Sequence, residues 1–258
     1  MFKSKIEWCT YSHNFWHGCK KLGTECAACY MYRDKKKSNQ SGSNIYRLSD
    51  ATFYKPLYIK EGGLIFTCSY SDFFIEDADN WREDAWDVIR RTPWHIWLIL
   101  TKRPERIEKC LPHDWGNGWP NVWLGVSIGV QDSFHRALTL SNIPASIRFI
   151  SGEPLLEELD FLIEMGGKRI IDSFQWVILG GESGDESGPY KYRQCKVEWF
   201  ERAIGDLQSL KHVKIFVKQL GSHLRKEMNL RDRFGGEMKE WPEGLKIREY
   251  PETDSISV

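Results

Sequence analysis

Seven short apolar segments recur along the chain, and this repetition constrains the fold more than any other feature of the sequence. Each segment is rich in β-branched or aromatic residues and ends in a cluster of polar residues or glycine. Strands that are apolar along nearly their whole length are typical of a parallel sheet whose two faces are both covered. The segments are residues 5–10, 64–69, 95–100, 122–127, 147–150, 176–179 and 213–217.

Amphipathic stretches that lie between these segments have the spacing of helices. They are residues 79–91, 104–110, 131–140 and 196–210. Strands that alternate with helices predict right-handed crossovers and a parallel α/β sheet. Seven strands suit a barrel or an incomplete barrel better than a short open sheet, and a doubly wound sheet is the alternative. Residues 34–44 (DKKKSNQSGSN) have the composition of a mobile loop.

The bulk composition fits one domain in the cytoplasm. A length of 258 residues is comfortable for a single α/β barrel. Lys and Arg number 36, as do Asp and Glu, so net charge gives no indication of a nucleic-acid partner. No apolar run approaches the roughly 20 residues of a membrane span, and the N-terminus lacks the apolar core of a signal peptide. In that compartment the seven cysteines are expected to be thiols or metal ligands.

Polar residues follow almost every predicted strand. Because the chemistry of parallel α/β folds gathers at the carboxyl ends of the strands, we expect these residues to form one active-site rim. The alternative for each is a hydrogen bond that only positions a loop. The rim positions are residues 69–72, 101–104, 127, 151–154, 180–184 and 218–219.

Three cysteines directly after the first apolar segment give the sharpest chemical signal. Six residues separate Cys19 from Cys26, and two separate Cys26 from Cys29. Such spacing can bring three thiolates to one metal centre, and Gly18 and Gly23 allow the chain to fold tightly over it. Three cysteines without an obvious fourth ligand favour an iron–sulfur cluster with one open iron.

Two other interpretations of these cysteines remain open. A zinc site could be completed by His13, His17 or Cys9, because structural zinc takes four protein ligands. The cysteines could also be buried thiols that bind no metal, as is common in protein cores.

Several longer motifs carry a resemblance to a known family. In order along the chain, and together with the three cysteines, they are residues 6–8 (IEW), 100–106 (LTKRPER), 121–127 (NVWLGVS), 148–156 (RFISGEPLL), 180–184 (GGESG) and 216–221 (FVKQLG). Over nearly its whole length the chain resembles the phage-associated three-cysteine proteins of formerly unknown function. These look like an outlying radical SAM family related to spore photoproduct lyase.

The cysteine motif departs from the commonest radical SAM pattern, which has three residues between its first two cysteines. The wider gap is typical of the resembled family. Ala28 replaces the aromatic residue usual before the last cysteine, and Cys9 stands where the family is expected to have Thr. These departures affect the expected geometry of the loop that carries the three cysteines.

The resemblance implies a fold and a cofactor chemistry. The fold is a partial (β/α)6-type TIM barrel in a single radical SAM-like domain of residues 1–258, with a cluster loop at 17–30, a barrel over about 5–220 and a C-terminal extension at 221–258. Cys19, Cys26 and Cys29 would ligate a [4Fe–4S] cluster whose fourth iron binds S-adenosyl-L-methionine (SAM). An electron from a donor such as flavodoxin or ferredoxin would then generate a 5′-deoxyadenosyl radical.

The resemblance also gives the rim residues provisional roles. Lys102, with Arg103 as second candidate, would bind the methionine carboxylate, and Lys218 and Gln219 would face the substrate. The catalytic candidates are Lys102, Glu153 and Lys218. The cofactor-binding candidates are Ser71, Asp72, Lys102, Arg103, Ser127, Glu153, Gly180, Gly181 and Glu182. Cys68, Cys110 and Cys195 are expected to be inert, although a cysteine that faces the radical could donate a hydrogen atom.

The expected substrate is a DNA nucleotide, for example a hypermodified thymidine in phage DNA, and the expected reaction is an isomerisation or a lyase-type reaction. Two alternatives stay open: a zinc-stabilised nucleic-acid-binding protein without catalysis, and a radical SAM enzyme that acts on a peptide or small metabolite. Basic residues that could contact phosphates are Lys20, Lys21, Arg33, Lys35, Lys36, Lys37 and Arg47, and then Lys191, Arg193, Lys214, Arg225, Arg231 and Arg233. Loop aromatics that could stack on bases are Trp115, Trp119, Tyr190 and Tyr192.

Overall fold

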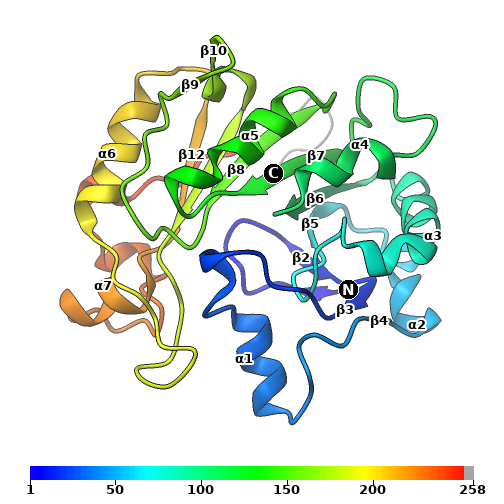
Figure 1. Cartoon of the computed structure of the whole chain (residues 1–258), viewed down its shortest axis with the longest axis horizontal. Coiled ribbons are helices and arrows are strands. Elements are labelled where there is room, and N and C mark those ends of the chain that lie inside the picture. The colour runs from blue at the N-terminus through cyan, green and yellow to red at the C-terminus, as the bar shows by residue number, and fades with distance from the viewer. Residues whose placement is uncertain (253–258) are drawn as a thin grey trace.

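A computed structural model describes residues 1–252, and within them eight strands form one curled sheet (Figure 1). The strands follow one another across the sheet in chain order. Only the first pair is antiparallel, and every later pair is parallel. In order they are β1 (Phe2–Lys3), β2 (Tyr11–His13), β5 (Gly63–Thr67), β6 (His95–Thr101), β7 (Val122–Ser127), β8 (Ile147–Gly152), β11 (Trp176–Gly180) and β12 (Lys214–Gln219).

Helices connect the parallel strands and pack on one face of the sheet. Apolar residues of α3 (Asp79–Arg90), α5 (Phe134–Ser141) and α6 (Val197–Gln208) share a core with one set of strand residues. The shorter helices are α1 (Tyr30–Lys37), α2 (Asp50–Phe53), α4 (Ile107–Cys110) and α7 (Gly221–Glu227). Two small hairpins pair β3 (Trp16–His17) with β4 (Tyr46–Arg47), and β9 (Glu164–Met165) with β10 (Lys168–Arg169).

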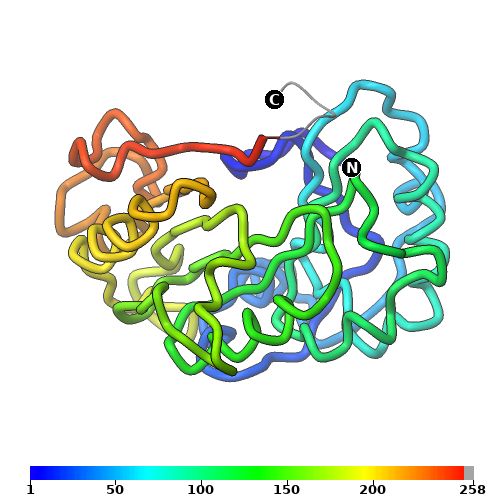
Figure 2. Tube along the Cα trace, turned by 90° about the horizontal axis from the view of Figure 1, so that it is seen from above, coloured from blue at the N-terminus to red at the C-terminus, as the bar shows by residue number. Residues whose placement is uncertain are grey.

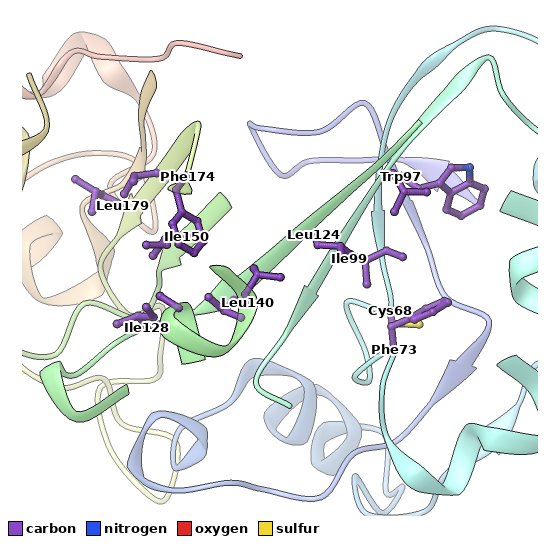
Figure 3. Close-up of a cluster of buried hydrophobic side chains, with 14 of the residues drawn as sticks. Cys68, Phe73, Trp97, Ile99, Leu124, Ile128, Leu140, Ile150, Phe174 and Leu179 are labelled. Atoms are coloured by element: carbon purple, nitrogen blue, oxygen red, sulfur yellow. The ribbon is translucent and has the colours of Figure 1, made fainter. Parts of the chain in front are cut away.

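Successive residues of each strand alternate between two separate cores, as the pleat of a strand requires. Figure 3 shows part of the core on the helix side, where Leu140 of α5 lies between Leu124 and Ile150 and Trp97 lies farther along the sheet. The opposite face, which we call the inner face, carries a second core without helices. It is mostly aromatic, and its strand members are Leu64, Phe66, Ile96, Leu98, Trp123, Phe149, Trp176, Ile178 and Phe216.

Segments near the two ends of the chain cover the inner face at the end where its strands begin. Trp8 packs on Phe66 with ring centroids 4.6 Å apart, and Tyr250 packs on Trp176 at 5.5 Å. The backbone around Tyr250 pairs with β12 through the Val217 amide and the Ile247 carbonyl oxygen, 2.8 Å apart. Figure 2 shows this C-terminal segment crossing toward the N-terminal one. Aromatic packing therefore fills the N-terminal end of the inner face and leaves polar residues at its C-terminal end.

The predicted parallel α/β sheet is confirmed, and six of the seven predicted strands lie within about two residues of the observed ones among residues 1–252. A strand order without reversal shows that the doubly wound alternative was wrong. The first strand was misplaced, because residues 4–10 form a tight loop in which the Ser4 amide bonds the Thr10 carbonyl at 2.9 Å. The predicted loop 34–44 begins instead as the second half of α1. No helix in the described part of the chain has the length and apolarity needed to cross a membrane.

The buried histidine of β2 makes stability dependent on pH. His13 is 1% exposed and packs against Phe15 at 4.5 Å, and burial lowers its pKa well below the ordinary value. An unfolded histidine titrates near 6.5, so below that pH the unfolded chain binds more protons than the folded one. We expect the stability advantage of wild type over His13→Leu to be constant above about pH 7 and to shrink by up to about 1.4 kcal/mol per pH unit below 6.5.

Chemical denaturation from pH 8 to pH 5 measures this difference. His212→Leu, at an exposed histidine, serves as control and should leave the pH profile unchanged. Parallel profiles for wild type and His13→Leu would contradict the assignment.

Candidate functional site

The cluster loop, residues 17–30, crosses the carboxyl ends of the parallel strands. Its carbonyl oxygens accept hydrogen bonds from side chains that follow three different strands. Ser71 after β5 donates to the Gly18 carbonyl at 2.5 Å, Arg103 after β6 donates to the Lys20 carbonyl at 2.7 Å, and Arg193 after β11 donates to the Thr24 carbonyl at 2.7 Å. A segment with little regular structure is thereby tied to the rim of the sheet.

Glu25 fixes the loop between its first two cysteines most strongly. Its side chain is buried, and its carboxylate accepts hydrogen bonds from the Gly129 amide at 2.7 Å and from the Ser133 hydroxyl at 3.0 Å. It also pairs with the buried guanidinium of Arg136, with an N–O distance of 2.8 Å. A buried carboxylate is stable only when it is paired and hydrogen-bonded in this way. Nothing in the sequence pointed to Glu25, because a glutamate in a polar loop is usually solvated.

Asp72 and Arg103 form a second buried pair beside the first cysteine. The Asp72 carboxylate accepts hydrogen bonds from the Thr101 hydroxyl at 2.7 Å, the Lys102 amide at 3.1 Å and Arg103 at 3.1 Å. The same nitrogen of Arg103 lies 3.8 Å from the sulfur of Cys19. Asp72 therefore acts on the loop through Arg103, and Arg103 donates toward the sulfur of a predicted metal ligand.

The environment of Cys19 keeps its thiol protonated at neutral pH. Burial raises the pKa of Cys19 to about 11, the carboxylate of Asp72 adds to the rise, and Arg103 opposes it. A thiol must lose its proton to bind a metal, so metal binding at Cys19 would release a proton. The guanidinium of Arg103 can then donate a charge-assisted hydrogen bond to the thiolate.

The three predicted ligands all lie in the cluster loop and are half-buried, free thiols. The Cys29 amide donates to the Cys26 carbonyl at 3.5 Å, and Cys29 precedes the first turn of α1. Cys9, Cys68 and Cys195 are buried. Among residues 1–252 no three His, Cys, Asp or Glu side chains converge as they would around a single metal ion. The iron–sulfur interpretation and its zinc alternative both stay predictions.

Glu153 and Lys218 form an ion pair on the inner face, above the aromatic core. Their N–O distance is 2.8 Å, and the Ser151 hydroxyl lies 3.3 Å from the other carboxylate oxygen. A Cβ atom at Gly180 would collide with the Glu153 carboxylate, so a larger residue there would displace that carboxylate. Burial acts to lower the pKa of Lys218, but the charge and hydrogen bond of Glu153, with Glu7, outweigh it and raise the pKa.

Tyr30, the last residue of the cluster loop, begins α1. Its hydroxyl donates to the Ser69 carbonyl at 2.5 Å. Burial, followed by the nearby Cys29, Tyr70 and Glu153, raises its pKa well above the ordinary value, although 36% of its surface is exposed. The sequence analysis did not single out Tyr30 as a site residue.

Most other rim residues make contacts that position loops. Glu182 is buried and accepts hydrogen bonds from the backbone and guanidinium of Arg193. The Ser127 carbonyl accepts from Arg136 at 2.8 Å, and a Cβ atom at Gly181 would collide with the Leu220 carbonyl. The half-buried Lys102 differs, because its ammonium has no hydrogen bond or ion pair within the described residues.

The residues predicted to contact nucleic acid also include both buried and surface side chains. Trp115 is only 5% exposed and packs on Trp86 at 5.6 Å, so the prediction that it is free to stack on a base was wrong. Tyr190, in contrast, lies at the surface between the ammonium groups of Lys21 and Lys36, each 5.8 Å from its ring centroid.

Removing the charge of Glu25 should release the cluster loop. Glu25→Gln leaves the Arg136 guanidinium buried without a counter-charge, and breaking a buried pair from one side costs about 3–5 kcal/mol. We expect a lower free energy of unfolding by roughly that amount and faster alkylation of Cys26 and Cys29 in the folded protein, measured by mass spectrometry. Glu158→Gln, at an exposed glutamate, is the control. Unchanged alkylation rates in Glu25→Gln would show that Glu25 does not hold the loop.

The ion pair on the inner face gives a separate prediction. Because Glu153 raises the pKa of Lys218, Glu153→Gln should leave more of the amine neutral and reactive at pH 8. We expect acetylation of Lys218 by an active ester to accelerate about tenfold for each pKa unit lost. Lys214, at the other end of the same strand, is the internal control and should react at an unchanged rate. Equal rates for Lys218 in both proteins would contradict the pairing.

Comparison with known proteins identifies a family. The model of a family described as "Protein of unknown function (DUF5131)" matches residues 3–249. No curated protein and no solved structure matches the chain. Because the matched region covers almost the whole sequence, the chain belongs to the DUF5131 family.

Proposed function

We propose that this protein is a radical SAM enzyme whose Cys19, Cys26 and Cys29 hold a [4Fe–4S] cluster, and that its curled sheet is the partial (β/α)6-type barrel of that superfamily. The observation that carries the proposal is the anchoring of a three-cysteine loop across the carboxyl ends of parallel strands. In parallel α/β folds this edge of the sheet is where catalytic groups gather.

The donor set of the loop fits such a cofactor. Three thiols lie within one short segment, none of them is in a disulfide, and Arg103 lies beside the first. Hydrogen bonds to cluster ligands are one means by which a protein adjusts reduction potential. When bound, the cluster supplies the electron that cleaves SAM and so generates the 5′-deoxyadenosyl radical. The uncommitted ammonium of Lys102 is suited to hold the methionine carboxylate.

The inner-face residues would handle the substrate. Glu153 and Lys218 offer an acceptor and a donor side by side, fixed by their mutual ion pair. Their place above an aromatic core keeps bulk water away from one side, which strengthens polar contacts to a bound molecule. In this arrangement the two residues orient the substrate and can hold or deliver a proton at its reacting end.

The proposed substrate is a nucleotide of DNA, such as a modified thymidine of phage DNA. Exposed Lys20, Lys21 and Lys36 lie on or next to the cluster loop, and Lys21 lies over the ring of Tyr32 at 4.8 Å. Cationic side chains interleaved with aromatic rings are suited to a single-stranded or flipped-out nucleotide. The proposed reaction is an isomerisation or a lyase-type reaction, with a flavodoxin or ferredoxin as the electron donor.

Anaerobic reconstitution tests the cofactor. We expect protein purified without oxygen and treated with iron and sulfide to bind about four irons, to absorb near ~400 nm, and to release 5′-deoxyadenosine from SAM after reduction. Cys26→Ala should lose all three properties. Cys110→Ala, a half-buried cysteine outside the loop, should keep them.

Two outcomes would contradict the proposal. One is a colourless protein that holds a single zinc and does not cleave SAM, which would favour a zinc-stabilised binding protein. The other is equal iron content in the Cys26→Ala and Cys110→Ala variants, which would place the cluster elsewhere.

A further inference from the structure

Lys35 is a buried cation without a carboxylate partner. The residue lies in α1 and is 7% exposed. Its ammonium donates to the Gln40 carbonyl oxygen at 2.7 Å and to the Tyr46 hydroxyl at 2.8 Å, and it lies 3.4 Å from Nδ1 of His17. No carboxylate among residues 1–252 lies within ion-pair distance of Lys35.

This arrangement leaves a positive charge without adequate compensation. Removing an ammonium from water costs several kcal/mol even after the protein relaxes. The C-terminal end of α1 attracts a cation, but a helix end contributes only about 0.3–1 kcal/mol. The hydrogen bonds to Gln40 and Tyr46 do not supply a negative charge, whereas an anion close to Lys35 would supply one.

A surface hollow of about 390 Å³ adjoins the Lys35 ammonium. It is lined by Gln40, Ser41, Asn44 and Tyr46, two of which are the partners of Lys35. Because Lys35 occupies the Gln40 carbonyl oxygen, the amide nitrogen of Gln40 remains free to donate. The Tyr46 hydroxyl accepts from Lys35 and also lies 3.3 Å from Nδ1 of His17. The side chains of Gln40, Ser41 and Asn44 can donate hydrogen bonds, and none of the four lining side chains is acidic.

We propose that this hollow is an anion site that binds a phosphate group. Three donor side chains around one hollow match the several oxygens of a phosphate better than the two of a carboxylate. The charge of Lys35 behind Gln40 and Tyr46 would attract the anion through those two polarised groups. The phosphate could belong to a nucleic-acid backbone or to a small phosphate ester. The site does not depend on the proposed cofactor chemistry, because none of the cluster-loop cysteines lines it.

Binding of inorganic phosphate to the full-length protein tests the site. Isothermal titration at constant ionic strength would compare wild type with Lys35→Met and with Lys211→Met, at an exposed lysine outside the hollow that carries the same charge. We expect wild type and Lys211→Met to bind phosphate equally and Lys35→Met to bind at least about tenfold more weakly. No binding to wild type, or equal weakening in both variants, would overturn the proposal.

A second variant covers the case in which Lys35→Met fails to fold. Asn44 lines the hollow from an exposed position and makes no side-chain contact with Lys35, so Asn44→Ala is expected to fold normally. It should also weaken phosphate binding, and unchanged binding in Asn44→Ala would count against the site. Circular dichroism verifies the fold of each variant.

Competition identifies the source of the phosphate. A single-stranded oligonucleotide that displaces inorganic phosphate from wild type, and loses affinity in Lys35→Met, would assign the site to a nucleic-acid backbone. Phosphate binding without such competition would assign it to a small phosphate ester. Both results support an anion site.

Discussion

The buried carboxylate of Glu25 is the constraint on which the candidate site depends. Residues 17–30 contain only one 3-10 turn and the edge of a short hairpin, so regular backbone bonding cannot hold them in place. Glu25 does so by accepting from a backbone amide, a hydroxyl and Arg136, all of which belong to the segment around β7 and α5. The same Arg136 binds the Ser127 carbonyl at the end of β7, which joins the cysteine loop to the sheet itself.

The curled sheet divides its inner face into a structural half and a polar half. Aromatic side chains such as Trp8, Phe149 and Trp176 fill the end where the strands begin. Farther along the same strands, Ser151, Glu153 and Lys218 replace them with an ion pair and a hydroxyl. Polar groups are tolerated there because each has a partner, and they lie on the side of the sheet that the cluster loop crosses.

The sequence predicted the elements with strong periodicity and missed those decided by tertiary contacts. Residues 122–127 and 95–100 form strands because their apolar runs can be buried on both faces. Residues 5–10 have the same composition but form a loop, because Trp8 and Cys9 insert into the inner core from the side. The rim was predictable from strand ends, whereas the roles of Glu25 and Lys35 were not. The sequence does not show whether a charged residue is solvated or buried. For Glu25 this depends on partners more than 100 residues away, and for Lys35 it depends on a local hollow.

The anchored loop is proposed to hold a four-iron cluster with one open iron, and Mössbauer spectroscopy of protein reconstituted with iron-57 tests this most directly. We expect the spectrum of a [4Fe–4S] cluster in which SAM changes the parameters of one iron. The other three irons, bound by Cys19, Cys26 and Cys29, should be unchanged. A spectrum without a four-iron cluster, or one in which SAM has no effect on any iron, would contradict it.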